Sequence, residues 1–132
     1  MAAAPTWPVC VKAVLIWRDD VILVRADDEA WELPGDRLER GESLEDCAER
    51  AVEQLGLKAT AERLLDSRVS DLDDAKAPLM VTFGCSVDVP DPDALGDDYV
   101  EVRLVPVKEI GSLALSEVYA ASITAWHRLL GR

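Results

Sequence analysis

The sequence predicts a mixed α/β or α+β domain, in which a β-sheet packs against helices. The order of hydrophobic patterns is the first indication, because strand-like segments precede one helix and further strands precede a second helix. Composition is the second, since 49% hydrophobic and 30% charged residues are ordinary for a soluble globular protein. Length is the third: 132 residues suit a single domain, 1–132, with its own hydrophobic core.

A β-hairpin is predicted near the start of the chain. The segment PVCVKAVLIW, residues 8–17, is rich in β-branched residues, and VILVRA, residues 21–26, follows directly after the short polar turn RDD. Two strands joined by so short a turn are expected to pair with each other. Residues 33–42 carry a Pro-Gly pair and a further glycine, Gly41, and therefore predict a loop.

A helix is predicted over residues 43–55, because the apolar residues change to a spacing of three and four. These residues are Leu44, Cys47, Ala48, Ala51, Val52 and Leu55. Ser43 stands at the N-cap with Asp46 three residues later, which is the arrangement of a capping box. Gly56 stands where a left-handed residue would end the helix.

The second half of the chain alternates between strands and polar segments and closes with a helix. The expected elements are a strand with a polar loop (59–76), a strand (78–89), an acidic loop (90–98), a strand (99–107) and a short helical turn (108–113). Ser116 is then expected to cap a final helix. Its apolar stripe is formed by Tyr119, Ile123, Trp126 and Leu130.

Charge and cysteine content exclude several classes of function. A formal net charge of −12 repels phosphate backbones, so bulk nucleic acid is excluded as a partner. A small phosphorylated ligand is compatible with this negative charge if a cation lies between the ligand and the protein. Cys10, Cys47 and Cys85 are far apart and outside any C-x-x-C pattern, so neither a disulfide framework nor a zinc site is predicted.

The N-terminus predicts no targeting to a membrane. The segment MAAAPTWP lacks a basic region followed by an apolar one, and no apolar run approaches the roughly 20 residues that span a bilayer. We therefore expect a cytoplasmic protein without membrane contact. The sequence is compatible with a homodimer.

One stretch, WELPGDRLERGESLEDCAERAVEQLGL at residues 31–57, resembles the box of the Nudix (MutT-like) superfamily. That box reads G-x5-E-x7-R-E-U-x-E-E-x-G-U, where U is aliphatic, and L-P-G usually precedes it. Glu42 matches its first glutamate, and Arg50 stands at the required eighth position after Glu42. The segments GLKATAERLLDS, VTFGC and VEVRLVPVKEI also resemble the family, so the resemblance covers nearly the whole chain.

The resemblance implies a fold and a chemistry. The fold is a mixed sheet sandwiched between helices. The activity is pyrophosphohydrolase activity, in which water attacks a phosphorus of a nucleoside diphosphate linked to another group. Mg²⁺ or Mn²⁺ bridges the diphosphate to glutamates of the box helix, and the box arginine, here Arg50, orients a catalytic glutamate. The expected partner is therefore a small nucleotide-like ligand.

The chain departs from this box where the metal ligands should stand. Asp36 replaces a glycine, and the expected glutamates are replaced by Ala51, Gln54 and Leu55. Arg50 is also one residue too close to Gly56. Two alignments of this helix with the family's box stay open. In one of them Gln54 is a neutral ligand, and in the other both Glu53 and Gln54 are ligands. Neither restores three carboxylates, so the box is degenerate and Mg²⁺ should bind weakly.

A rearranged site is the alternative, because Glu45, Glu49 and Glu53 are spaced four apart along one polar edge of the helix. Trp31 is a candidate for stacking on a nucleobase, and Glu101 matches a family position close to the cleft. The candidate residues are Glu49, Arg50 and Glu53 for catalysis; Asp36, Glu42, Glu49 and Glu53 for metal; Trp31 and Glu101 for substrate; and Gly35, Gly41 and Gly56 for the backbone of the box.

Three hypotheses on function follow. The first is a Nudix-like protein that binds or acts on a nucleoside-diphosphate-linked molecule with hydrolysis weakened or lost. The second is an active hydrolase that uses Mg²⁺ or Mn²⁺ with a rearranged carboxylate set. The third is a non-catalytic structural or complex subunit. Fold alone does not choose among them.

Overall fold

The computed structural model describes residues 7–26, 29–69, 77–95 and 101–131. In chain order the elements are β1 (Val9–Trp17), β2 (Asp20–Arg25), β3 (Gly35–Arg37), α1 (Leu44–Glu53), β4 (Ala59–Val69), β5 (Leu79–Val87), the 3-10 helix η1 (Pro92–Ala94), β6 (Glu101–Pro106), the 3-10 helix η2 (Val107–Ser112) and α2 (Glu117–Leu129). Parts of the predicted loops at 70–76 and 96–98, and the first residues of the predicted strand 99–107, lie outside the described residues.

The strands form one mixed sheet. Its order is β4-β5-β1-β2-β6, and β3 pairs with β1 beside this path. β1 and β5 are parallel, whereas the other described neighbours are antiparallel. The predicted hairpin is confirmed, since Trp17 of β1 pairs with Asp20 of β2. Arg18 and Asp19 between them both have positive φ, as a two-residue hairpin turn requires.

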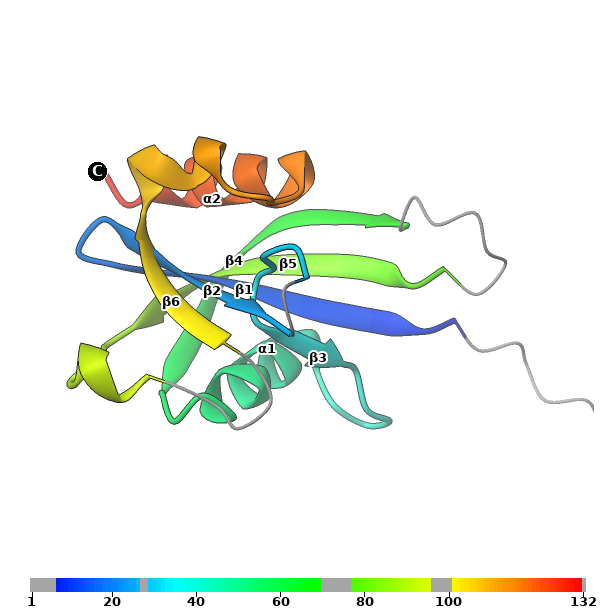
Figure 1. The fold of residues 1–132 in the computed structure, drawn as a ribbon. Coiled ribbons are helices and arrows are strands. Elements are labelled where there is room, and N and C mark those ends of the chain that lie inside the picture. Colours follow the sequence, from blue (N-terminus) through cyan, green and yellow to red (C-terminus); the bar gives the residue numbers. More distant parts are fainter. Residues whose placement is uncertain (1–6, 27–28, 70–76, 96–100, 132) are drawn as a thin grey trace, which may run out of the picture.

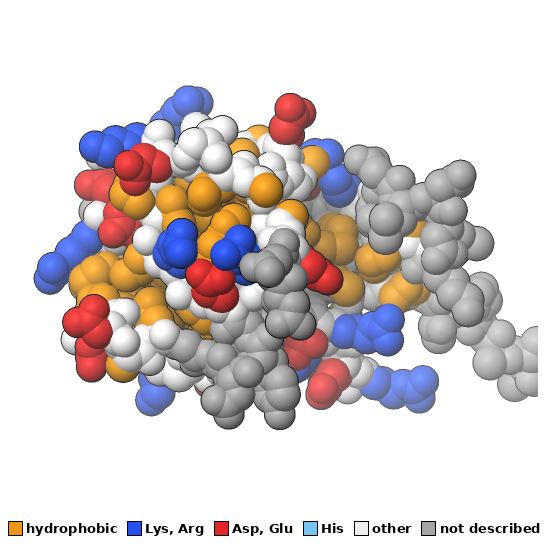
Figure 2. All heavy atoms as spheres, in the orientation of Figure 1, with side chains coloured by type: hydrophobic (Ala, Val, Ile, Leu, Met, Phe, Trp, Pro, Cys, Tyr) orange, Lys and Arg blue, Asp and Glu red, His pale blue; other side chains and the backbone are white. Residues whose placement is uncertain are grey.

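The sheet lies between the two α-helices, with α1 on one face and α2 on the other (Figure 1). This arrangement confirms the predicted mixed sheet sandwiched between helices. The buried residues on the α1 side include Val11, Ala13, Leu15, Cys47, Ala48 and Val52. Those on the α2 side include Val14, Ile16, Leu23, Ile123 and Trp126. Successive side chains of β1 thus supply opposite faces of the sheet, which is why that strand is apolar almost throughout. On the face shown in Figure 2, charged side chains of both signs are scattered around exposed apolar areas.

The predicted first helix is confirmed with a small change at its end. The Ser43 Oγ accepts a hydrogen bond from the Asp46 N–H at 3.0 Å, as expected of an N-cap. The helix ends at Glu53 with Gln54 as C-cap, two residues before the predicted end at Leu55. Gly56 follows with a φ of +79°, so the left-handed residue lies where the sequence placed it.

The predicted loop at 33–42 is wrong in one part, because it contains the short strand β3. Gly35 allows this strand to form: a Cβ on Gly35 would lie 2.5 Å from the Val11 carbonyl oxygen on β1. The close approach of two backbones therefore requires glycine. The loop continues to Gly41, whose φ of +81° suits the tight turn closed by the Glu42 N–H and the Glu39 carbonyl at 3.1 Å.

The final helix is confirmed with Ser116 as its N-cap. Ile123 and Trp126 are buried, and the Trp126 Nε1–H donates to the Cys85 carbonyl of β5 at 3.3 Å. The predicted apolar stripe is wrong at its end, since Leu130 is 39% exposed. The reason is that α2 ends at Leu129, so Leu130 lies past the last turn that packs on the sheet.

Candidate functional site

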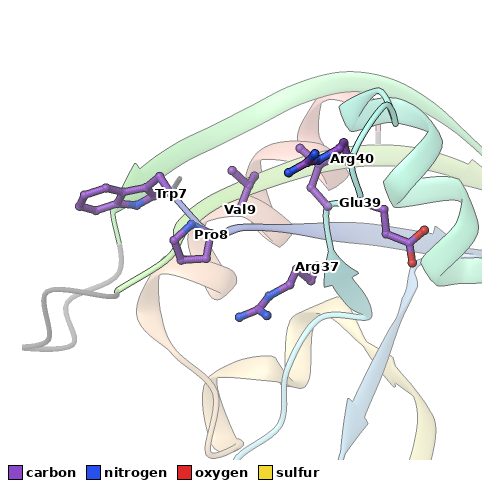
Figure 3. Close-up of a pocket in the computed structure, with 7 residues that line it drawn as sticks. Trp7, Pro8, Val9, Arg37, Glu39 and Arg40 are labelled. Atoms are coloured by element: carbon purple, nitrogen blue, oxygen red, sulfur yellow. The ribbon is translucent and has the colours of Figure 1, made fainter. Parts of the chain in front are cut away.

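A pocket of about 380 Å³ borders the loop that follows β3. Its lining consists of Trp7, Pro8, Val9, Arg37, Leu38, Glu39 and Arg40 (Figure 3). None of the residues expected to bind metal or substrate lines it. Two of the expected box residues, Asp36 and Glu42, lie instead around Arg50.

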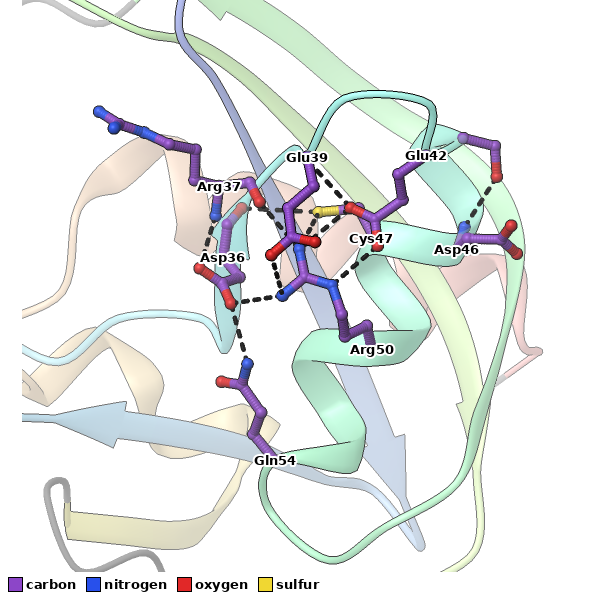
Figure 4. Close-up of polar contacts among 9 residues, drawn as sticks. Asp36, Arg37, Glu39, Glu42, Asp46, Cys47, Arg50 and Gln54 are labelled. Carbon is purple, nitrogen blue, oxygen red and sulfur yellow. Dashed lines mark hydrogen bonds and ion pairs between the residues drawn. The ribbon is translucent and has the colours of Figure 1, made fainter.

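Arg50 is the centre of what we call the loop–helix unit, which consists of β3, residues 38–43 and α1. Arg50 lies in the last turn of α1, and its side chain extends to the loop, where it contacts Glu42 (Figure 4). The Arg50 Nε donates to Glu42 Oε2 at 2.7 Å, and Nη2 donates to Glu42 Oε1 at 3.0 Å. Such a bidentate pair fixes the orientation of both side chains.

Asp36 binds the other side of the same guanidinium. The Arg50 Nη1 donates to Asp36 Oδ2 at 2.7 Å, and Nη2 also donates to the Arg37 carbonyl at 2.9 Å. The Gln54 amide donates to the same Asp36 oxygen at 2.9 Å. A further carboxylate, that of Glu39, lies 3.9 Å from Nη1. One arginine therefore draws together a glutamate, an aspartate and a carbonyl from the loop.

These contacts shift the pKa values of the unit. Hydrogen bonds from Arg50 lower the pKa of Glu42 to about 2. Partial burial raises the pKa of Asp36, but the hydrogen bonds from Gln54, the Arg37 N–H and Arg50 outweigh it, so the pKa is lowered overall. Burial, followed by the Glu42 charge, raises the pKa of the Cys47 thiol to about 11. Asp36 and Glu42 are thus ionised and Cys47 is protonated at neutral pH.

The other expected carboxylates of the helix point elsewhere. The Glu49 Oε2 accepts a hydrogen bond from the Ala61 N–H of β4 at 3.0 Å, which ties α1 to the edge of the sheet. Glu53 is exposed at the end of α1, and Ala51 between Arg50 and Val52 is buried. Glu49 and Glu53 are therefore not brought together with Asp36 and Glu42.

A second charged cluster, the arginine–tryptophan cluster, consists of Arg25, Trp31, Glu101 and Arg103. The guanidinium carbons of Arg25 and Arg103 lie 4.5 Å and 5.1 Å from the centre of the Trp31 ring. The Arg25 Nε donates to Glu101 Oε2 at 2.9 Å, and the Arg103 Nη2 donates to Glu101 Oε1 at 3.1 Å. Both expected substrate residues, Trp31 and Glu101, are therefore brought together, and two arginines join them.

The backbone holds this cluster in place. The Trp31 N–H donates to the Ala114 carbonyl at 2.8 Å, and Val24 of β2 exchanges two hydrogen bonds with Glu32. The Trp31 side chain is only 4% exposed, so the ring belongs to the core and the arginines cover it. The Trp31 ring is therefore buried, and the guanidinium groups of Arg25 and Arg103 lie over it.

Arg25 and Arg103 were not among the site residues predicted from the sequence. Arg25 is directly opposite Glu101 in the antiparallel pair of β2 and β6, and Arg103 is opposite Leu23. Opposite charges at directly facing positions are the signal of such a pair. The signal is usable only once β2 and β6 are known to be neighbours.

Comparison with known proteins identifies the family. A family model described as the NUDIX domain matches residues 7–127. The chain belongs to the Nudix family. A comparison with curated proteins finds no match.

Solved structures share the Nudix fold with this chain at low sequence identity. A UDP-X diphosphatase has a TM-score of 0.75 and 23% identity over 98% of this chain, which spans 66% of the length of that protein. A NUDIX hydrolase from Nitrosomonas europaea has a TM-score of 0.74 and 22% identity, with 93% of this chain and 90% of the other covered. An ADP-ribose pyrophosphatase from Streptococcus suis has a TM-score of 0.69 and 17% identity, with coverages of 94% and 92%. These likenesses show the fold.

Within the part of the chain that the structure describes, the residues around the box do not fit the divalent ion that the box implies. Within residues 7–26, 29–69, 77–95 and 101–131, no three or more His, Cys, Asp or Glu side chains are grouped so that they could hold a metal ion. Asp36 and Glu42 are already bound to Arg50, and Glu49 to a backbone N–H. Hard divalent cations need several anionic oxygens that are free to converge. Here a guanidinium stands between those oxygens.

The part of the chain that the structure describes contains no helix long and apolar enough to cross a membrane.

Proposed function

We propose that this Nudix protein binds a nucleoside-diphosphate-linked small molecule and that its metal-dependent pyrophosphohydrolase activity is weak or lost. The observation that carries this proposal is the position of Arg50. Its guanidinium donates hydrogen bonds to both Asp36 and Glu42, two of the carboxylates that are candidates for binding a metal ion. With Ala51 and Gln54 at family glutamate positions, the helix supplies no replacement.

The arginine–tryptophan cluster supports the choice of an anionic ligand. Arg25 and Arg103 share one carboxylate between them, so the cluster keeps one positive charge in a chain of net charge −12. Planar guanidinium groups bind phosphate oxygens in a bidentate manner without a metal ion. The ligand classes to test first are those in the names of structural neighbours, nucleoside diphosphates joined to a further group and ADP-ribose.

The alternatives are kept as outcomes of the test. An active hydrolase would use Mg²⁺ or Mn²⁺ with Glu49 and Glu53, and a structural subunit would bind neither nucleotide nor metal. A cytoplasmic location is a further proposal, and a homodimer is compatible with the sequence.

The deciding experiment measures turnover and binding side by side. The protein is incubated with Mg²⁺ or Mn²⁺ and a panel of nucleoside triphosphates, nucleoside diphosphate sugars, ADP-ribose and dinucleoside polyphosphates, and released phosphate and monophosphate are quantified. The same panel is screened for a rise in melting temperature in the presence of a chelator. We expect little or no turnover and a rise in Tm with at least one compound.

Two results would change the assignment. Metal-dependent turnover that is lost in Glu53→Gln and kept in Glu117→Gln, an exposed glutamate at the start of α2, would establish the active hydrolase. Absence of both turnover and Tm shift for every compound, together with a stable oligomer by light scattering, would favour the structural subunit.

A further inference from the structure

The pocket beside the loop after β3 contains an exposed tryptophan that the proposed function does not use. We call it the Trp7 pocket; its volume is about 380 Å³. Trp7 is 56% exposed, more than any other large hydrophobic side chain in the part of the chain that the structure describes. A single exposed hydrophobic residue is common on protein surfaces, so Trp7 gains meaning only from its neighbours.

Two of those neighbours, Arg37 and Arg40, bring positive charge to the pocket. Both side chains are exposed, and among the described residues neither guanidinium group has a hydrogen-bond or ion-pair partner. Both groups are therefore available to an anion, and a guanidinium group can bind a phosphate through two parallel hydrogen bonds. An exposed ring beside two available cations is a combination that fits an aromatic anion.

The pocket lining also includes a carboxylate, that of Glu39, which is directed elsewhere. In Figure 3 the Glu39 carboxylate points away from Trp7. Its Oε1 lies 3.9 Å from Arg50 Nη1, so its charge faces α1. With Arg37 and Arg40 against one glutamate, the lining has an excess of positive charge. Such an excess is what an anion needs in a chain of net charge −12.

The backbone around the pocket is held by hydrogen bonds of the sheet. The Leu38 N–H donates to the Val9 carbonyl at 2.8 Å, and the Leu79 N–H donates to the Pro8 carbonyl at 2.9 Å. The segment that carries Trp7 is thus joined both to the loop after β3 and to β5. Walls that are in place before a ligand arrives lower the entropic cost of binding.

We propose that the Trp7 pocket is a second ligand site, which binds a small molecule with a flat aromatic ring joined to a phosphate, as in a nucleoside monophosphate. The ring stacks on Trp7, and the phosphate accepts hydrogen bonds from Arg37 and Arg40. The volume suits one such molecule, because small-molecule sites span about 300–1,000 Å³.

This site follows from the chain's own residues. Arg37 and Arg40 stand at positions that the box, G-x5-E, leaves open, and Trp7 lies outside the box. The inference goes beyond the proposed function, whose anionic ligand is assigned to the arginine–tryptophan cluster. The two sites share no residue, so variants can separate them.

The experiment titrates AMP, GMP, CMP and UMP into the protein in chelator and follows tryptophan fluorescence and the heat of binding. A base that stacks on Trp7 should quench its emission. Trp7→Ala should abolish the quenching and weaken binding of the tightest monophosphate by about 10-fold. Trp7→Phe keeps a ring and should keep most of the affinity in calorimetry. Arg37→Ala combined with Arg40→Ala should weaken binding by about 10-fold or more.

The matched control for charge is Arg63→Ala combined with Arg128→Ala. Both are exposed arginines, on β4 and α2, and neither lines the pocket. This variant loses the same charge as the pocket variant and should bind the monophosphate as the wild type does. Adenosine and ribose 5-phosphate each carry only one part of the ligand, so both should bind more weakly than AMP.

Several results would overturn the proposal. These are the absence of heat and quenching with every monophosphate at millimolar concentration, unchanged affinity in Trp7→Ala or in the pocket arginine variant, and equal affinity for ribose 5-phosphate and AMP. Monophosphate binding that is lost in Arg25→Ala with Arg103→Ala and kept in Trp7→Ala would place the nucleotide at the arginine–tryptophan cluster. That outcome overturns the second site and leaves the proposed function intact.

Discussion

The two charged clusters of this protein are built with opposite excess charge. In the loop–helix unit a single cation, Arg50, faces Asp36 and Glu42, with Glu39 farther away. In the arginine–tryptophan cluster a single anion, Glu101, faces two cations. In the first cluster all three nitrogens of the Arg50 guanidinium group donate hydrogen bonds within the protein. The second cluster has one positive charge in excess.

This difference indicates where an anionic ligand can be stabilised. A phosphate placed at the loop–helix unit would meet an excess of carboxylates and would need an added cation. A phosphate placed near Arg25 and Arg103 would compete with one carboxylate for two guanidinium groups. Of these two clusters, the one with excess positive charge therefore lies outside the family's box.

The largest expected effect comes from removing the positive charge of the second cluster. A charged hydrogen bond contributes about 1.5–3 kcal/mol, so Arg25→Ala combined with Arg103→Ala should weaken binding of any nucleotide found in the screen by about 100-fold or more. Isothermal titration calorimetry at two salt concentrations measures the loss, and the dependence on salt should become weaker as well.

The matched control for this variant is Arg63→Ala. Arg63 is an exposed arginine of β4, at the opposite edge of the sheet from β6, and its removal changes the net charge without touching Trp31. If Arg63→Ala weakens binding as much as Arg103→Ala alone, the effect is one of net charge and the cluster is not the binding site.

Lowering the pH should reduce the stability of the protein mainly through the loop–helix unit. The folded-state pKa of Glu42 is about 2 against an ordinary value of 4.5, and that of Asp36 is also lowered. These groups contribute stability that is present above their unfolded pKa values and is lost as pH falls toward their folded values. We expect the free energy of unfolding, measured with urea, to fall as pH decreases from 4.5 to 2.

Two variants test whether Glu42 causes this loss of stability in acid. Glu42→Gln should be less stable near neutral pH and should lose less stability over the same acid range. Glu45→Gln on the exposed side of α1 should keep the dependence of the wild type. Equal slopes for Glu42→Gln and wild type would mean that other carboxylates cause the acid sensitivity.

The local pattern of residue types was sufficient to predict most of the fold. The spacing of apolar residues and the caps at Ser43 and Ser116 predicted both α-helices, because a helix face repeats over neighbouring residues. The strand β3 was missed since nothing local marks it. It forms because Gly35 lets its backbone approach β1, and that contact joins residues more than 20 positions apart.

The candidate site was harder to predict for the same reason. The sequence identified the residues of the box and their departures from the family, but it did not show that Arg50 binds Asp36 or that Gln54 completes the contact. Likewise, Arg25 and Glu101 are 76 residues apart and meet only through the pairing of β2 with β6. Side-chain charge is readable along a sequence, whereas its neutralisation depends on which elements become neighbours.

The smallest expected effect concerns Glu101, and it separates the two clusters most sharply. Glu101→Gln removes the carboxylate that competes for Arg25 and Arg103, so affinity for inorganic pyrophosphate should rise a few-fold, consistent with about 0.5–1 kcal/mol for a partly exposed ion pair. The equivalent change in the first cluster, Glu42→Gln, should leave pyrophosphate affinity unchanged, because Asp36 and the Arg37 carbonyl still bind the freed guanidinium. Titration calorimetry with pyrophosphate compares the two variants. A gain in Glu42→Gln that equals the gain in Glu101→Gln would mean that both arginine sites attract anions and that the contrast between the clusters does not determine where the ligand binds.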